Sequence, residues 1–157
     1  MILPILTYPN KILEKKAEKI KDVRDPEIKE LIFDMLETLN SSDNGMGLAA
    51  PQVGKSLRLC VIRFNRRNYI LVNPKIKSRS LGKEIMEEGC LSFPGIYVPI
   101  KRSKKVKVET MDRHGKKIEI KADGILSRAM QHEIDHLDGI LFIKRMSKKD
   151  KERLLKI

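Results

Sequence analysis

One amphipathic segment near the C-terminus, residues 124–138, constrains the fold of this chain more than any other part of the sequence. Asp123 precedes the segment as the expected N-cap, and Gly139 follows it as a helix-ending glycine. The apolar residues of the segment recur at helical spacing: Ile125, Leu126, Ala129, Met130, Ile134 and Leu137. We therefore predict a central helix around which the other elements pack.

The same helix carries His132 and His136, two of the three histidines in the chain, with Glu133 beside the first. Residues four apart on a helix differ by about 40° around its axis, so both imidazoles can bind one tetrahedral ion. Glu133 is rotated by about 100° from His132 and can take a proton from metal-bound water without ligating the ion. The alternative is a chance HExxH match on an amphipathic helix.

A hydrolytic metal site needs a third protein ligand and an open position. The long zinc-protease motif fails because Phe142 stands where its third histidine belongs. Glu152 has a suitable separation but lies in a lysine-rich tail, and His114 lies in an expected turn. The aspartates of the helix do not share the histidines' face well. Cys90, in a Glu-Gly-Cys sequence read as a turn, is the remaining candidate, a thiol that an ion would deprotonate.

Other patterns predict an α+β fold, with mostly antiparallel strands packed around the C-terminal helix that carries HExxH, and with an N-terminal helix. The N-terminal helix begins after Asp25, the expected cap, and ends before Ser41. The tail after Met146 is expected to form a short charged helix. The pattern predicts two hairpins: residues 57–64 with 69–72 around loop 65–68, and 106–111 with 117–122 around turn 112–115.

A length of 157 residues, 41% of them apolar, fits a single domain over residues 1–157, expected to be a monomer. There is no apolar run of eighteen residues and no signal-peptide pattern, so we expect a cytoplasmic protein with reduced thiols. The net charge of +12 attracts polyanions. Residues 101–107 and the tail are candidates for contact with ribosomal RNA, with an ordinary solvated surface as the alternative.

Three segments, in matching order and spacing, resemble the motifs of the peptide deformylases. They are residues 45–52 (GMGLAAPQ), 88–92 (EGCLS) and 131–139 (QHEIDHLDG). The resemblance covers nearly the whole chain and is to the bacterial-type polypeptide deformylases. It implies an enzyme that hydrolyses the N-formyl group of the initiator methionine in newly made polypeptides and releases formate.

The resemblance also implies the role of each site residue. The metal ligands would be Cys90, His132 and His136. The ion is usually Fe²⁺ in this family, and Zn²⁺, Ni²⁺ or Co²⁺ can substitute. Metal-activated water would attack the formyl carbon, with Glu133 as general base and acid. The side-chain amide of Gln52 and the backbone N–H of Leu91 would stabilise the negative charge on the formyl oxygen.

Five further positions match the substrate-binding residues of the family: Gly45, Met46, Gly47, Gly89 and Ala129. The glycines would let an extended peptide pair with the chain as an added strand. Met46, Leu91, Ala129 and His132 would line the methionine pocket, although Met46 and Leu91 could be plain core residues. The chain departs from the family at residues 100–102, where Ile-Lys-Arg replaces the common Val-Pro-Arg.

Two other functions are compatible with these residues. One is a related hydrolase that acts on a different N-acyl group. The other is a basic RNA- or ribosome-binding module with a structural metal, which predicts a closed four-ligand site; the sequence offers no apparent fourth soft ligand near the three.

Overall fold

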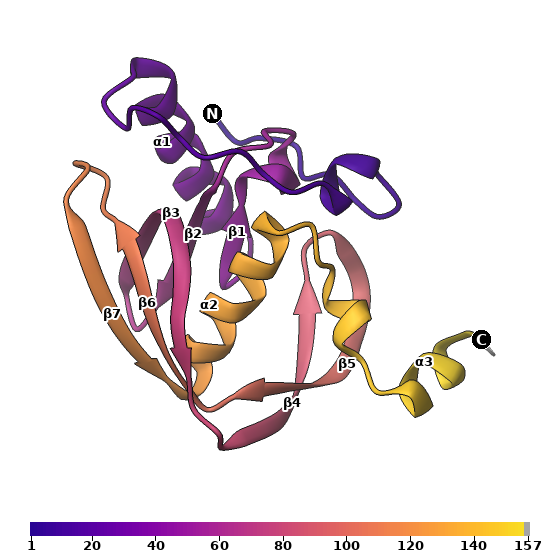
Figure 1. The fold of residues 1–157 in the computed structure, drawn as a ribbon. Coiled ribbons are helices and arrows are strands. Elements are labelled where there is room, and N and C mark those ends of the chain that lie inside the picture. The colour runs from indigo at the N-terminus through magenta and orange to yellow at the C-terminus, as the bar shows by residue number, and fades with distance from the viewer. Residues whose placement is uncertain (156–157) are drawn as a thin grey trace.

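The computed structural model describes residues 1–155 and shows the predicted α+β fold. Its helices are η1 (Lys11–Glu14), α1 (Pro26–Asn40), η2 (Ala50–Val53), α2 (Gly124–Leu137), η3 (Phe142–Arg145) and α3 (Lys148–Leu155), where η marks a 3₁₀ helix. Its strands are β1 (Gly47–Ala49), β2 (Leu59–Phe64), β3 (Arg67–Arg79), β4 (Lys83–Cys90), β5 (Phe93–Ser103), β6 (Lys105–Met111) and β7 (Lys117–Asp123). Figure 1 shows α2 at the centre of these elements.

The larger sheet is antiparallel, with the strand order β1-β2-β3-β6-β7. Its two faces carry different helices, because successive side chains of a strand point to opposite faces. In β2, Cys60 and Ile62 pack in the same apolar cluster as α2, whereas Leu59 and Val61 pack in the same cluster as α1. The sheet thus lies between the two helices.

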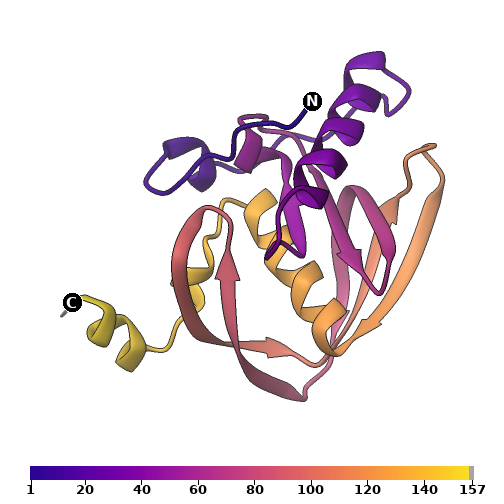
Figure 2. The same ribbon diagram turned by 180° about the vertical axis from the view of Figure 1, so that it is seen from behind.

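A second, two-stranded sheet of β4 and β5 lies on the other side of α2 (Figures 1 and 2). The helix is therefore covered from both sides, and every residue from Leu126 to Leu137 is buried. Five of the six predicted apolar residues of α2 pack in the same cluster as the large sheet: Leu126, Ala129, Met130, Ile134 and Leu137. The sixth, Ile125, was predicted wrongly, because it lies in the first turn of the helix and is 44% exposed. The polar face of α2 is buried as well: Ser127, Arg128, Gln131, His132, Glu133, Asp135 and His136.

Both predicted hairpins form, and the first differs in its boundaries. The loop between β2 and β3 is the pair Asn65 and Arg66, both at positive φ, rather than residues 65–68. This two-residue geometry matches the right-handed twist of the strands. β3 then continues far beyond the predicted end at residue 72, and β2 begins at Leu59 rather than Leu57.

One local prediction around the site was wrong, and another was confirmed only in its position. Cys90 ends strand β4, and the turn follows it at residues 91–92, so Glu-Gly-Cys is not a turn. Asp123 occupies the N-cap position of α2 but makes no side-chain capping hydrogen bond. The predicted end of the helix is confirmed, since Gly139 has a φ of 73° and a Cβ there would lie 2.6 Å from the Glu14 carbonyl oxygen. Within residues 1–155, no helix has the length and apolar character needed to cross a membrane.

Candidate metal centre

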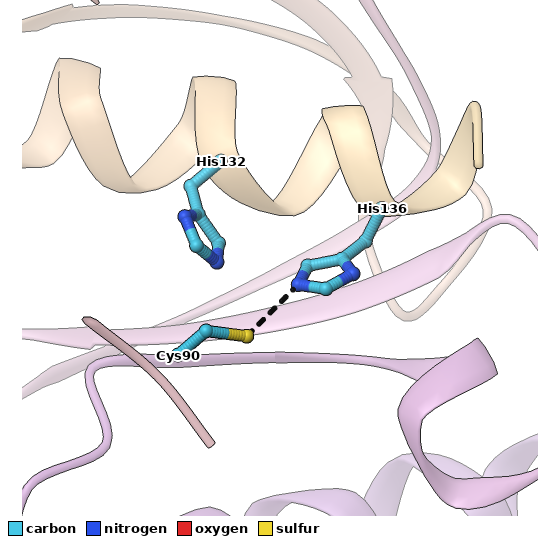
Figure 3. A group of neighbouring side chains, drawn as sticks. All are labelled: Cys90, His132 and His136. Atoms are coloured by element: carbon cyan, nitrogen blue, oxygen red, sulfur yellow. Dashed lines mark hydrogen bonds between the residues drawn. The ribbon is translucent and has the colours of Figure 1, made fainter. Parts of the chain in front are cut away.

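The structure brings together the three side chains expected to bind metal. Cys90 comes from the end of β4, and His132 and His136 from consecutive turns of α2 (Figure 3). Their ligand atoms all lie within 4.8 Å of one another, and Cys90 Sγ is 3.3 Å from His136 Nε2. The thiol is half-buried, whereas both imidazoles are buried.

This donor set fits a transition-metal ion. In a tetrahedral zinc site, bond lengths of about 2.0–2.3 Å place neighbouring ligand atoms about 3.3–3.6 Å apart, close to the sulfur–nitrogen separation seen here. One thiol and two imidazoles suit Fe²⁺, Co²⁺, Ni²⁺ or Zn²⁺. Among the described residues, no fourth His, Cys, Asp or Glu joins the cluster, so one position is open.

The electrostatics of the two histidines differ. Burial lowers the pKa of His136 well below its usual value, and the charge of His132 acts in the same direction, so His136 is neutral, the form that binds metal. Burial alone would also lower the pKa of His132, but Glu133, Cys90 and Glu88 outweigh it and raise that pKa well above normal. The two carboxyl groups, Glu88 and Glu133, favour a positive charge beside them.

Glu88 orients His132 and was not identified from the sequence. Its Oε1 lies 2.8 Å from His132 Nδ1, which leaves Nε2 of that ring to face the cluster. Burial would raise the pKa of Glu88, but hydrogen bonds with His132 and Arg102 hold it well below its usual range. A signal did exist, because Glu88 and Cys90 share one face when the segment is a strand.

Arg102 links Glu88 to the centre of α2. Its Nε and Nη2 donate to the Glu88 carboxylate at 2.9 and 3.0 Å, and its Nη1 donates to Asp135 at 2.6 Å. Arg145 also donates to Asp135, at 3.0 and 3.1 Å. Two guanidinium groups therefore bind the Asp135 carboxylate. This agrees with the sequence analysis, which did not favour the aspartates of this helix as metal ligands.

Glu133 flanks the cluster without joining it. It is 4% exposed, and its Oε1 has no hydrogen-bond partner within residues 1–155. Gly47 makes room for it, because a Cβ at that position would lie 2.5 Å from Glu133 Oε2. Burial raises the pKa of Glu133 to about 7, against the opposing charge of His132. A carboxyl group with a pKa near neutrality can both accept and return a proton.

Gln52 presents its amide nitrogen to the same space. Its Oε1 accepts a hydrogen bond from the Ala49 N–H at 2.9 Å, which fixes the amide orientation. Its Nε2 donates to Ser92 Oγ at 3.1 Å and lies 3.6 Å from Cys90 Sγ. Leu91 directly follows Cys90 in the turn between β4 and β5. Both expected oxyanion donors, Gln52 and Leu91, thus lie next to Cys90.

A cavity of about 590 Å³ opens beside the cluster. Its lining includes Glu133, Gln52 and Leu91, and all five expected substrate-binding residues: Gly45, Met46, Gly47, Gly89 and Ala129. Tyr97 covers Gly89, where a Cβ would lie 2.5 Å from the ring. A larger hollow of about 720 Å³ lies elsewhere, beside Arg58 and Asp138, and contains none of the expected site residues.

A three-ligand centre with an open position beside a buried carboxyl group places this protein among the metal-dependent hydrolases. The family model for polypeptide deformylase matches residues 2–152, and the chain belongs to this family.

Relatives cover nearly the whole chain. A peptide deformylase of Thermodesulfovibrio yellowstonii is 48% identical over 93% of this chain and 90% of its own length. The crystal structure of the Thermus thermophilus peptide deformylase matches with a TM-score of 0.92 and 42% identity, over 99% of this chain and 92% of that one. A Synechococcus elongatus peptide deformylase, crystallised in complex with actinonin, matches with a TM-score of 0.91 and 38% identity. The match covers 98% of this chain and 85% of that one.

Proposed function

We propose that this protein removes the N-formyl group from the initiator methionine of newly made polypeptides and releases formate. The observation that carries the proposal is the open cluster of Cys90, His132 and His136 beside the buried Glu133. Membership of the polypeptide deformylase family supports it. Neither observation favours the alternative of an RNA-binding module with a structural metal, because such a site is closed by four ligands.

Cys90, His132 and His136 would hold the ion, and we propose Fe²⁺, since the thiol and two imidazoles accommodate it and the family resemblance favours it. When bound, the ion supplies Lewis acidity that lowers the pKa of a water molecule. Glu133 accepts a proton from the water that attacks the formyl carbon. It then returns that proton to the amine nitrogen as the carbon–nitrogen bond breaks.

The negative charge that develops on the formyl oxygen requires donors that are already in place. We propose Gln52 Nε2 and the Leu91 N–H for this role. The anchoring of the Gln52 amide by Ala49 and Ser92 supports it, because a fixed donor needs no reorganisation during the reaction.

We propose that the peptide backbone lies between Gly45, Gly47 and Gly89, which flank the cavity from two sides. Residues without side chains there allow close backbone approach and pairing as an added strand. Met46, Leu91 and Ala129 would form the apolar wall for the methionine side chain. We also propose that residues 1–155 belong to one catalytic domain that acts as a cytoplasmic monomer; the expected boundary at residue 157 lies outside the described residues.

Anaerobic metal analysis coupled to formate release tests the function. The purified protein is expected to contain one ion per chain, predominantly iron, and to release formate from formyl-Met peptides. Chelation should abolish the activity, and Fe²⁺ or Co²⁺ should restore it. Acetyl-Met peptides are the control substrate, because hydrolysis of both at similar rates would indicate a different N-acyl hydrolase. A metal-containing protein that releases no formate would contradict the proposal.

We further propose that the basic C-terminal helix helps to recruit the protein to ribosomal RNA. Figures 1 and 2 show α3 projecting from the rest of the molecule. Lys148, Lys149 and Lys151 on this helix are exposed. Exposed lysines on a projecting element can contact backbone phosphates, and such binding weakens steeply with salt. Lys156, which extends the basic run in the sequence, lies outside the described residues.

Co-sedimentation with ribosomes is expected to fall as salt rises. Replacing Lys148, Lys149 and Lys151 by glutamine should weaken it at low salt. The matched control replaces three exposed lysines around β7, Lys116, Lys117 and Lys121, with the same change in net charge. Equal effects of both triple variants would indicate general charge attraction, and association that is absent or independent of salt would rule the proposal out.

A further inference from the structure

The three proposed metal ligands come from two separate elements of the fold that are far apart in the sequence. The two histidines lie on α2, whereas Cys90 lies on the separate two-stranded sheet of β4 and β5. An isolated pair of strands is marginally stable in water. The distance between the thiol and the imidazoles therefore depends on the contacts that hold β4 and β5 against α2.

Arg128 makes three of these contacts. Its side chain leaves α2 and reaches three acceptors on the two strands. Nη1 donates to Glu88 Oε2 at 2.6 Å and to the Ile100 carbonyl oxygen at 2.8 Å, and Nη2 donates to the Glu84 carbonyl oxygen at 2.7 Å. The residue is 7% exposed, and its bonds to Glu88 and Ile100 are buried, whereas the bond to Glu84 is partly buried. One guanidinium group thus fastens both strands to the helix.

The same guanidinium is connected to two of the proposed ligands. Glu88 accepts from Arg128 on one oxygen and meets His132 Nδ1 on the other, at 2.8 Å. Glu88 also lies two residues before Cys90 on β4. Arg102 shares Glu88 but lies on β5 itself, so of these two arginines Arg128 is the one that reaches across from the helix to the backbone of both strands.

We propose that Arg128 is a positioning residue for the metal centre: it holds β4 on α2 so that Cys90 and His132 keep the separation that retains the ion. This inference rests on the proposed metal site and adds a residue that lines the site cavity but is not one of the three proposed ligands. Without Arg128, the two carbonyl groups lose a donor, and Glu88 loses one of its two arginine partners. Cys90 and His132 would then move more independently.

The test compares Arg128→Met with Arg58→Met. Arg58 is a matched buried arginine at 9% exposure, and it donates to the Leu137 carbonyl oxygen at 2.8 Å and to Asp138 at 2.9 Å. It bonds the end of α2, next to His136, and among the described residues its side chain makes no hydrogen bond to β4 or β5. Both variants should lower the melting temperature, because each loses buried hydrogen bonds.

Metal retention should separate the two variants. With Co²⁺ bound, release to a chelator is expected to be about 10–100-fold faster in Arg128→Met than in wild type, the usual cost of losing an outer partner of a metal site. The thiolate-to-cobalt absorption band should also shift or weaken. Arg58→Met should keep the wild-type release rate and band. Wild-type release from Arg128→Met, or equally fast release from both variants, would overturn the proposal.

If Arg128→Met does not fold, Arg128→Lys provides the test, because an ammonium group keeps the charge beside Glu88 but cannot reach all three acceptors. Its release rate should fall between those of wild type and the range expected for Arg128→Met, and a wild-type rate would count against the role of the carbonyl contacts. None of these measurements uses a formylated peptide. A protein that retains Co²⁺ through Arg128 but does not deformylate would therefore refute the proposed function and leave this inference standing.

Discussion

Replacement of Glu133 by glutamine is expected to remove most of the deformylase activity and to leave the metal in place. The amide has nearly the shape of the carboxyl group, but it cannot accept a proton from water at neutral pH. Loss of a general base typically costs about 10²–10⁴-fold in rate, and this should appear in kcat. Glu133 lies outside the three-ligand cluster, so the metal content should match that of wild type. Formate release and metal analysis on one preparation measure both.

Asp138→Asn is the matched control for this variant. It makes the same change of charge immediately after α2, where Asp138 pairs with Arg58 and does not line the site cavity. Its activity should stay close to wild type, with a modest loss of stability. Activity of Glu133→Gln equal to that of wild type would refute the proposed base. Loss of metal together with activity would instead assign Glu133 a ligand role.

The sequence predicted α2 and its chemistry because both depend on local spacing. His132, Glu133 and His136 lie within one helical turn and a half, and the apolar residues of the same helix mark its buried side. Helix α1 and the hairpin of β6 and β7 were also predicted, since their periodicities are regular and each has one apolar face. In that hairpin, Val106 lies opposite Ala122 and Val108 opposite Ile120.

Strands β4 and β5 could not be predicted in the same way. Most side chains of β4 are exposed or half-buried, so the strand shows no apolar alternation, and its single buried residue is the charged Glu88. β5 contains Pro94 and Pro99, which normally argue against a strand. A sheet of only two strands tolerates them, because each strand has a free edge. The pattern that identifies strands in a larger sheet is therefore missing here.

The charged contacts of the site could not be predicted for the same reason. Glu88, Arg102, Asp135 and Arg128 form a buried network whose members come from β4, β5 and α2. Each is an ordinary polar residue in its own segment. Their pairing follows from the way the two-stranded sheet lies on the polar face of α2, where every buried charge requires a partner. Cys90 was identified by elimination and by family resemblance, rather than from its place at the end of a strand.

Replacement of Cys90 by serine is expected to cause the largest loss of metal. A serine hydroxyl is a harder donor than a thiolate and stays protonated at neutral pH, so the centre would lose both its soft ligand and that ligand's negative charge. The affinity should fall by more than the roughly 10–100-fold that loss of an outer partner costs. Activity should fall with metal occupancy. Equilibrium dialysis with Co²⁺ measures the metal affinity, and formate release measures the activity.

Cys60→Ala is the matched control for Cys90→Ser. Cys60 is the other free cysteine; it lies on β2, fully buried in the apolar cluster that includes α2, and it belongs to no metal-binding cluster in the described part of the chain. Burial raises the pKa of its thiol well above the usual value, so it stays protonated and acts as an apolar residue. Its loss should lower the melting temperature and leave one metal ion per chain.

The two cysteine variants also distinguish a catalytic centre from a structural one. The two clusters that pack α1 and α2 against the large sheet do not include Cys90, so Cys90→Ser should remain folded without metal. A structural metal supplies folding energy, and its loss would unfold the chain. A folded, metal-free and inactive Cys90→Ser therefore supports a catalytic ion. An unfolded Cys90→Ser beside a folded Cys60→Ala would support a structural ion and contradict the proposed function.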